Sequence, residues 1–309
     1  MPAETQYPEK KIIPKVRPAL VEAAGSAPDP RVEELWLDFP QGRMRYVKAG
    51  SGPAIILIHG LMGYSFSWRF TIPALAPYMT VYAIDNLGAG FSTCIENIDS
   101  SVRATAERVL QFADAMGLES FDLLGTSHGG GVVIVVASIS SERKDARLRR
   151  LILVDPVNPW SPHGRRLAPL LASTLGSLIF RHTIEQWRWF DHLWLERLFA
   201  DRAKIPADSL AGYRLPVLKN HGFRHGTRVI RTWLADLAEI EAALPKIRDY
   251  PTLLIWGKAD RAVSFQSAEP LRQNFRHVRL VAFDGVGHLP YEEAPAEFNR
   301  ALLDFLAGG

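Results

Sequence analysis

The chain has 309 residues, of which 47% are hydrophobic and 22% are charged, and its formal net charge at pH 7 is +3. This composition is typical of a globular protein with one large core or a core plus an inserted subdomain, and the basic excess is too small to indicate a nucleic-acid partner. The single cysteine, Cys94, excludes an intrachain disulfide, and the lack of a long apolar run argues against a membrane span.

The N-terminal segment, residues 1–30, carries six prolines among charged and small residues. Prolines interrupt helices and few of the other side chains favour burial, so the sequence predicts an extended or disordered arm. The segment also lacks the apolar centre of a secretory signal. We therefore expect a cytoplasmic protein that is a monomer or a homodimer.

Strand patterns begin after this arm. Residues 35–39 and 44–48 alternate between apolar and polar side chains around a Pro-Gln-Gly turn, which predicts an antiparallel hairpin. Continuous apolar runs predict further, buried strands at 54–58, 81–84, 121–124 and 151–154. Helical spacing at 102–116 precedes Gly117, a plausible C-cap. Strands that alternate with helices in this way predict βαβ units in a mostly parallel sheet.

The strand pattern stops after residue 156 and returns at 252–256 and 278–283, before a final helix near 296–306. Between them lie helical stretches rich in Trp and Arg, at 168–180, 184–199 and 227–243. The sequence thus predicts an α/β core domain formed by residues 31–156 and 248–309, with a helical cap at 157–247. The cap would cover the carboxyl edge of the sheet, where ligands bind in open α/β sheets.

The predicted strand at 121–124 leads into a glycine-rich turn. Residues 125–129, Gly-Thr-Ser-His-Gly, fit the pattern G-x-S-x-G, in which a sharp strand-to-helix turn exposes the serine hydroxyl. Glycines are needed where the backbone passes too close for a Cβ atom. The pattern predicts that Ser127 is a nucleophile; the alternative is a turn whose serine only caps a helix.

A serine nucleophile needs a histidine base, and the histidine needs an acid to orient it. Asp260 follows the predicted strand at 252–256, and His288 follows the one at 278–283. Each could be an ordinary loop residue. With Ser127, they appear in the chain order Ser, Asp, His, and each follows a predicted strand, which predicts a catalytic triad. Asp155, which also ends a strand, is a rival for the acid, although Asp-Pro is a common strand exit.

An oxyanion intermediate needs two backbone N–H donors, one from the residue after the nucleophile and one from an early strand–helix loop. His128 and Leu61 occupy these positions. For His59 we favour a structural role, a hydrogen bond that shapes the loop.

Two other patterns could mark binding sites. His221 and His225 have metal-ligand spacing, but the glycine beside each argues against a helix and no acid or cysteine completes a set, so a solvated cap loop is the better interpretation. Gly88 and Gly90 match the first two glycines of the dinucleotide-binding pattern G-x-G-x-x-G, but Thr93 stands where the third glycine should be. We expect neither a metal nor a cofactor.

Five segments resemble successive conserved blocks of the α/β-hydrolase superfamily. They are HGLMG at 59–63, DNLGAGFS at 85–92, GTSHGG at 125–130, WGKAD at 256–260 and GHLPYEEAP at 287–295. The resemblance is to the capped branch, which includes esterases, carbon–carbon bond hydrolases, cofactor-free haloperoxidases, epoxide hydrolases and haloalkane dehalogenases. It implies an eight-stranded, mostly parallel sheet with helices on both faces, an inserted helical cap and the triad Ser127, Asp260 and His288.

Departures from the family pattern argue against some of the enzyme classes in this branch. Epoxide hydrolases and dehalogenases of this family use an aspartate nucleophile, where this chain has Ser127. Dehalogenases resemble one another in a tryptophan after the nucleophile, where His128 stands, and epoxide hydrolases use two cap tyrosines, whereas this cap holds only Tyr213. His128 beside the nucleophile resembles the GHSHGG segment of some bacterial lipases.

These observations predict a serine hydrolase of carboxylic esters with an apolar acyl or alcohol part. Trp187, Phe190 and Trp194 form one apolar helical face that could line a pocket, although such faces more often belong to a core. The alternatives are a carbon–carbon bond hydrolase of vinylogous diketones with the same triad, and a non-catalytic ligand-binding protein on a hydrolase scaffold. Perhydrolase or haloperoxidase activity could accompany the main reaction.

Overall fold

The computed structural model describes residues 32–161, 195–218 and 221–308, together with isolated residues between 165 and 179. The predicted arm at 1–30 lies outside the described residues, as do parts of the predicted cap helices at 168–180 and 184–199, including Trp187, Phe190 and Trp194. The division of the chain into arm, core and cap therefore stays a prediction.

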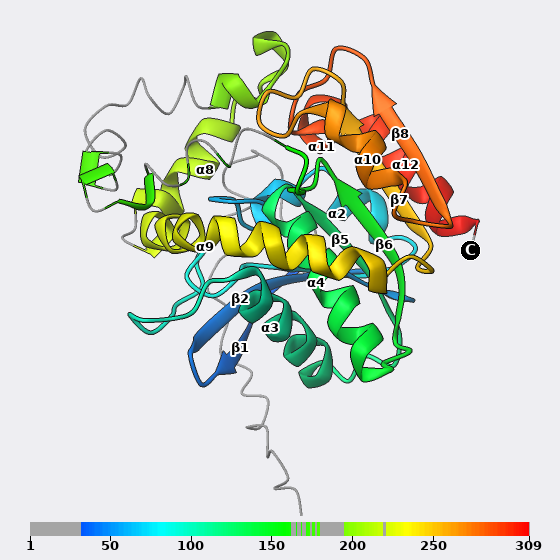
Figure 1. The fold of residues 1–309 in the computed structure, drawn as a ribbon, viewed down its shortest axis with the longest axis horizontal. Helices are drawn as coiled ribbons and strands as arrows, with labels where there is room; N and C mark the ends of the chain where they lie inside the picture. Colours follow the sequence, from blue (N-terminus) through cyan, green and yellow to red (C-terminus); the bar gives the residue numbers. More distant parts are fainter. Residues whose placement is uncertain are drawn as a thin grey trace, which may run out of the picture.

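Eight strands of the described chain form one sheet, in the order β1-β2-β4-β3-β5-β6-β7-β8 (Figure 1). Their bounds are β1 Val32–Phe39, β2 Gly42–Ala49, β3 Ala54–Ile58, β4 Thr80–Ile84, β5 Phe121–Thr126, β6 Leu148–Val154, β7 Thr252–Gly257 and β8 Val278–Phe283. β2 pairs antiparallel with β1 and β4, and all other pairs are parallel. The predicted opening hairpin and the mostly parallel eight-stranded sheet are confirmed.

Helices cover both faces of this sheet, which is why every residue of β3, β5 and β7 is buried. On one face, α3 (Val102–Ala115), α4 (His128–Arg143) and α9 (His221–Ala243) contact one another (Figure 1). The other face is covered by α2 (Ile72–Leu75), α11 (Pro290–Glu293) and α12 (Pro295–Ala307). Further helices are α8 Ser209–Leu218, α10 Ala268–Arg272, η1 Ser65–Trp68, η2 Arg202–Lys204, η3 Leu244–Lys246 and η4 Phe265–Ser267. None of the helices in the described ranges is both long and apolar enough to cross a membrane.

Local signals in the sequence explain where α3 begins and ends. The hydroxyl of Ser101 accepts a hydrogen bond from the backbone N–H of Ala104, which satisfies one free donor of the first turn. Gly117 then takes a φ of +63°, and the N–H of Leu118 donates to the carbonyl of Ala113. This is the glycine C-cap that the sequence predicts.

The prediction of a solvated loop around His221 and His225 is wrong, because α9 begins at His221. His225 is buried, with 4% of its surface exposed. The glycine that argued against a helix has a packing role: a Cβ on Gly226 would lie 3.2 Å from Cγ of Met62. The small residue lets the helix approach the loop after β3, and this packing outweighs its low helix propensity.

Candidate active site

Ser127 stands at the turn between β5 and α4, in a backbone conformation that few residues other than glycine adopt. Its φ is +53° and its ψ is −119°, a strain of about 1–3 kcal/mol that the surrounding structure must hold. The N–H of Ser127 donates to the carbonyl of Val154, and its own carbonyl accepts from the N–H groups of Gly130 and Val157. A Cβ on Gly129 would collide with the carbonyl oxygen of Ile58. The sharp turn predicted from G-x-S-x-G is therefore present.

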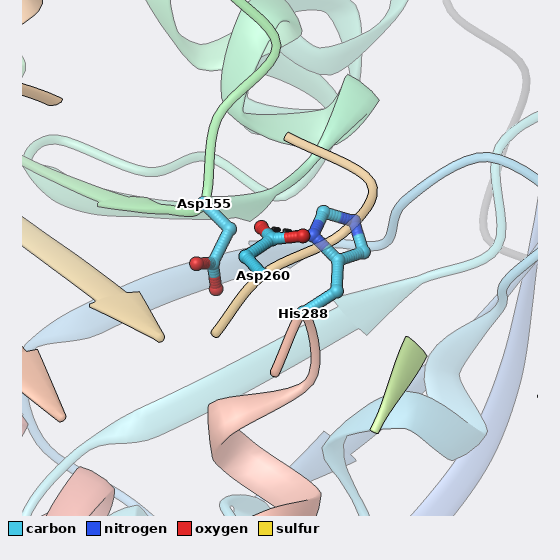
Figure 2. Close-up of side chains that lie close together, drawn as sticks. All are labelled: Asp155, Asp260 and His288. Carbon is cyan, nitrogen blue, oxygen red and sulfur yellow. Dashed lines mark hydrogen bonds and ion pairs between the residues drawn. The ribbon is translucent and has the colours of Figure 1, made fainter. Parts of the chain in front are cut away.

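His288 and Asp260 meet at the same edge of the sheet, in the loops after β8 and β7 (Figure 2). Nδ1 of His288 lies 2.7 Å from Oδ2 of Asp260, and both side chains are buried. The other carboxylate oxygen of Asp260 accepts from the N–H groups of Ala262 and Val263 at 2.6 and 3.0 Å. When Nδ1–H of His288 donates to this carboxylate, Nε2 carries the free lone pair of the ring and can accept a proton.

Ser127 and His288 both line one cavity of about 380 Å³. Gly60 and Leu61, from the loop after β3, lie on its wall. Most of the lining is apolar and includes Met62, Val157, Leu198, Ile230, Trp233 and Leu289. The cavity thus combines a possible nucleophile and base with an apolar wall, as small-molecule sites usually do.

The two predicted oxyanion donors also flank Ser127. A Cβ on Gly60 would lie 3.1 Å from Cβ of Ser127, so the loop that carries Leu61 packs against the serine. The N–H of Gly63 donates to the carbonyl of Gly60 and closes this turn, which does not use the N–H of Leu61. His128 is the first residue of α4, where backbone N–H groups lack partners within the helix.

A family model described as the alpha/beta hydrolase fold matches residues 53–295. The chain belongs to this family. A haloalkane dehalogenase 2 from Mycobacterium tuberculosis is 30% identical over 291 residues, which cover 90% of this chain and 97% of that protein. A 2-hydroxymuconate semialdehyde hydrolase from Pseudomonas sp. is 26% identical over 268 residues, covering 84% of this chain and 88% of that protein. The solved structure of a putative lipase from Acinetobacter baumannii has a TM-score of 0.77 at 21% identity, covers 94% of both chains and shows the shared fold.

His59 of this alpha/beta hydrolase connects two loops below the cavity. Its Nδ1 lies 2.7 Å from the carbonyl oxygen of Gly60, and its Nε2 accepts from the N–H of Asn86 at 3.1 Å. Burial lowers the pKa of His59, which keeps the ring neutral and Nε2 able to accept. The loop-shaping hydrogen bond expected for this residue is confirmed.

Asp155, the rival acid, is a buried neighbour of Asp260 and His288 (Figure 2). Its φ is +42°, and its Oδ1 accepts from the N–H of Gly257 at 2.9 Å. Burial, and next the Asp260 carboxylate, raise the pKa of Asp155 well above its usual value, which disfavours its charged form. The hydrogen bond from His288 goes to Asp260. These three side chains are also the one group in the described chain whose donor atoms are close enough to hold a metal ion.

The side chain of His128 is buried and packs against α9. Its ring stacks on Trp233 of α9, with centroids 6.2 Å apart. Burial, and next the field of His59, lower the pKa of His128 to about 4, so the ring is neutral at physiological pH. His225, nearby on α9, is also buried, and burial lowers its pKa well below the usual value.

Sequence reasoning missed a buried polar group beside the cavity. Ser67 and Tyr213 lie on the cavity wall, and Tyr213 contacts Glu292 and Ser67 through its hydroxyl. Arg69 forms an ion pair with Glu292 at 2.9 Å. The adjacent acids at 292 and 293, in a segment otherwise suited to burial, are the one signal that could have indicated such a partner.

Proposed function

We propose that this hydrolase cleaves carboxylic esters with an apolar acyl or alcohol part through an acyl-enzyme on Ser127. The observation that carries the proposal is the buried hydrogen bond between Asp260 and His288, which lines the same cavity as Ser127. A small-molecule ester would enter with its carbonyl carbon next to the Ser127 hydroxyl. The apolar wall would contact the rest of the substrate.

In the first half of the reaction, His288 Nε2 takes the hydroxyl proton while Oγ of Ser127 attacks the carbonyl carbon. The N–H groups of Leu61 and His128 would stabilise the oxyanion of the tetrahedral intermediate. The imidazolium then gives its proton to the departing alcohol. In the second half, water attacks the acyl-enzyme by the same steps and the acid is released.

The experiment compares hydrolysis of p-nitrophenyl butyrate by the wild-type protein and Ser127→Ala. Removing the nucleophile should lower kcat by roughly 10⁴-fold or more without changing the melting temperature by more than a few degrees. Ser141→Ala is the matched control, because Ser141 is exposed near the end of α4. Turnover that survives in Ser127→Ala would refute the nucleophile. Labelling of Ser127 by a fluorophosphonate would argue against a ligand-binding protein without catalysis.

A carbon–carbon bond hydrolase is the second candidate. It is supported by the 26% identical relative named 2-hydroxymuconate semialdehyde hydrolase, and the same three residues could serve it. Comparing kcat/KM for short-chain esters with that for a vinylogous diketone separates the two, since the preferred class should be turned over far faster. We do not propose halide release despite the 30% identical dehalogenase, because Ser127 stands at the nucleophile position.

A further inference from the structure

A chain of hydrogen bonds leads from a buried ion pair to the wall of the cavity. The side chain of Glu292, on α11, is fully buried and pairs with Arg69 at 2.9 Å. Ser209 donates its hydroxyl proton to the same carboxylate at 3.0 Å, and the hydroxyl of Tyr213 contacts its other oxygen. The Tyr213 oxygen in turn lies 3.1 Å from Oγ of Ser67.

The ion pair sets the direction of each bond in this chain. A carboxylate paired with a guanidinium has no proton to give and can only accept. Tyr213 has one hydroxyl proton, and it must point to Glu292. Burial, and next the Glu292 carboxylate, raise the pKa of Tyr213 well above its usual value, so the phenol keeps this proton.

The contact between Tyr213 and Ser67 then has one possible polarity. Because the phenol proton is committed to Glu292, the proton between the two oxygens must come from Ser67. Both hydroxyl protons are thereby used inside the network. The two oxygens can therefore only accept further hydrogen bonds. Both residues line the cavity that holds Ser127 and His288.

We infer that the Ser67 and Tyr213 oxygens form an acceptor site that selects esters carrying a hydroxyl or N–H donor on the acyl or alcohol part. This inference rests on the proposed ester hydrolysis by Ser127. Much of the remaining wall is apolar, and a donor placed against that apolar part would lose its water without gaining a partner. A donor that reaches these two oxygens keeps its hydrogen bond.

Selection of this kind is measurable because a site that binds a substrate hydroxyl disfavours the analogue that lacks it. We expect kcat/KM for the correctly placed hydroxyl to exceed that of its methyl ether by about tenfold to a hundredfold. The methyl ether retains an oxygen but cannot donate, so it tests for a donor rather than for polarity. The n-alkyl ester provides the apolar reference.

The experiment measures kcat/KM by pH-stat for ω-hydroxyalkyl acetates and methyl ω-hydroxyalkanoates of increasing chain length, each with its methoxy and n-alkyl counterparts. Ser67→Ala and Tyr213→Phe should bring the hydroxyl-to-methoxy ratio close to one. Ser67→Ala leaves the Tyr213–Glu292 contact in place and keeps the test valid if Tyr213→Phe folds poorly. Tyr82→Phe is the matched control, because Tyr82 is buried on β4 and does not line the cavity, and it should keep the ratio.

The inference is overturned if the wild-type protein shows no hydroxyl preference at any chain length in either series. It is also overturned if a preference persists in both Ser67→Ala and Tyr213→Phe. Ester turnover that depends on Ser127 but shows no preference would remove this inference alone. Turnover that survives in Ser127→Ala would remove the proposed function with it.

Discussion

Replacing Asp260 by asparagine tests the assignment of the catalytic acid. The Asp260 carboxylate lies 2.7 Å from Nδ1 of His288 and accepts backbone bonds from Ala262 and Val263 through its other oxygen. Asparagine can keep the backbone bonds with its carbonyl oxygen. Its amide would then face Nδ1, where it favours the wrong tautomer of His288 and cannot stabilise the imidazolium. The loop should therefore stay folded while the base is lost.

The expected loss in kcat is roughly 10⁴-fold, the size seen when a triad aspartate becomes asparagine. At 1.36 kcal/mol per factor of ten, this corresponds to about 5 kcal/mol of transition-state stabilisation. The assay is p-nitrophenyl butyrate hydrolysis across pH 5 to 10, with the melting temperature as the check on folding. Asp249→Asn, at an exposed residue paired with Arg276, is the control and should retain full activity.

Asp155→Asn is the decisive comparison, because Asp155 is the other carboxyl beside His288. Burial raises the pKa of Asp155 and so disfavours its charged form, and Nδ1 of His288 contacts Asp260 rather than Asp155. A neutral amide that still accepts from the N–H of Gly257 should cost less than about tenfold in kcat. If Asp155→Asn caused the large loss and Asp260→Asn did not, the acid would be Asp155 and the assignment would be wrong.

Two further predictions concern stability. Burial first of all raises the pKa of Asp236 to about 6, above its unfolded value, so its contribution to stability falls as the pH rises from about 4 to about 6. Asp236→Asn keeps an acceptor for the N–H of Val102. Between about pH 4 and about pH 6 the free energy of unfolding of this variant should rise by about 2 kcal/mol relative to that of the wild type, and above that window the difference should stay constant. A difference that does not change with pH would contradict this. In Gly129→Ala the added Cβ would collide with the carbonyl of Ile58, so the free energy of unfolding measured in urea should fall by at least about 2 kcal/mol. In Gly117→Ala the free energy of unfolding should fall by only about 1 kcal/mol, because φ is +63° but the space around the residue is open. Equal losses in Gly129→Ala and Gly117→Ala would refute the steric explanation.

Much of the sheet could be predicted from the sequence because parallel strands are buried on both faces. The apolar runs at 54–58 and 252–256 correspond to β3 and β7, in which every residue is buried. The candidate site could be predicted for a related reason. Parallel strands end at one edge, so the loops after β5, β7 and β8 all lie at the same edge of the sheet.

Side-chain partners that depend on packing could not be predicted in this way. Asp155 and Asp260 both follow strands, and the sequence does not show which one His288 contacts or that the two carboxyls lie together. The histidine at 225 is a second example. The glycine beside it lowers helix propensity, but close approach to Met62 and burial of the ring favour the helix more strongly.

The same distinction separates the chemistry of this hydrolase from its selectivity. Ser127, Asp260 and His288 follow β5, β7 and β8, so strand order places all three at one edge of the sheet. Ser67 and Tyr213 lie 146 residues apart and meet only because α8 packs over the loop after β3. The direction of the hydrogen bond between them depends in turn on the carboxylate of Glu292. Glu292 lies on α11, directly after the loop that carries His288. Because its carboxylate fixes the direction of the Tyr213–Ser67 hydrogen bond, substitutions at Glu292 should alter the hydroxyl preference of the cavity.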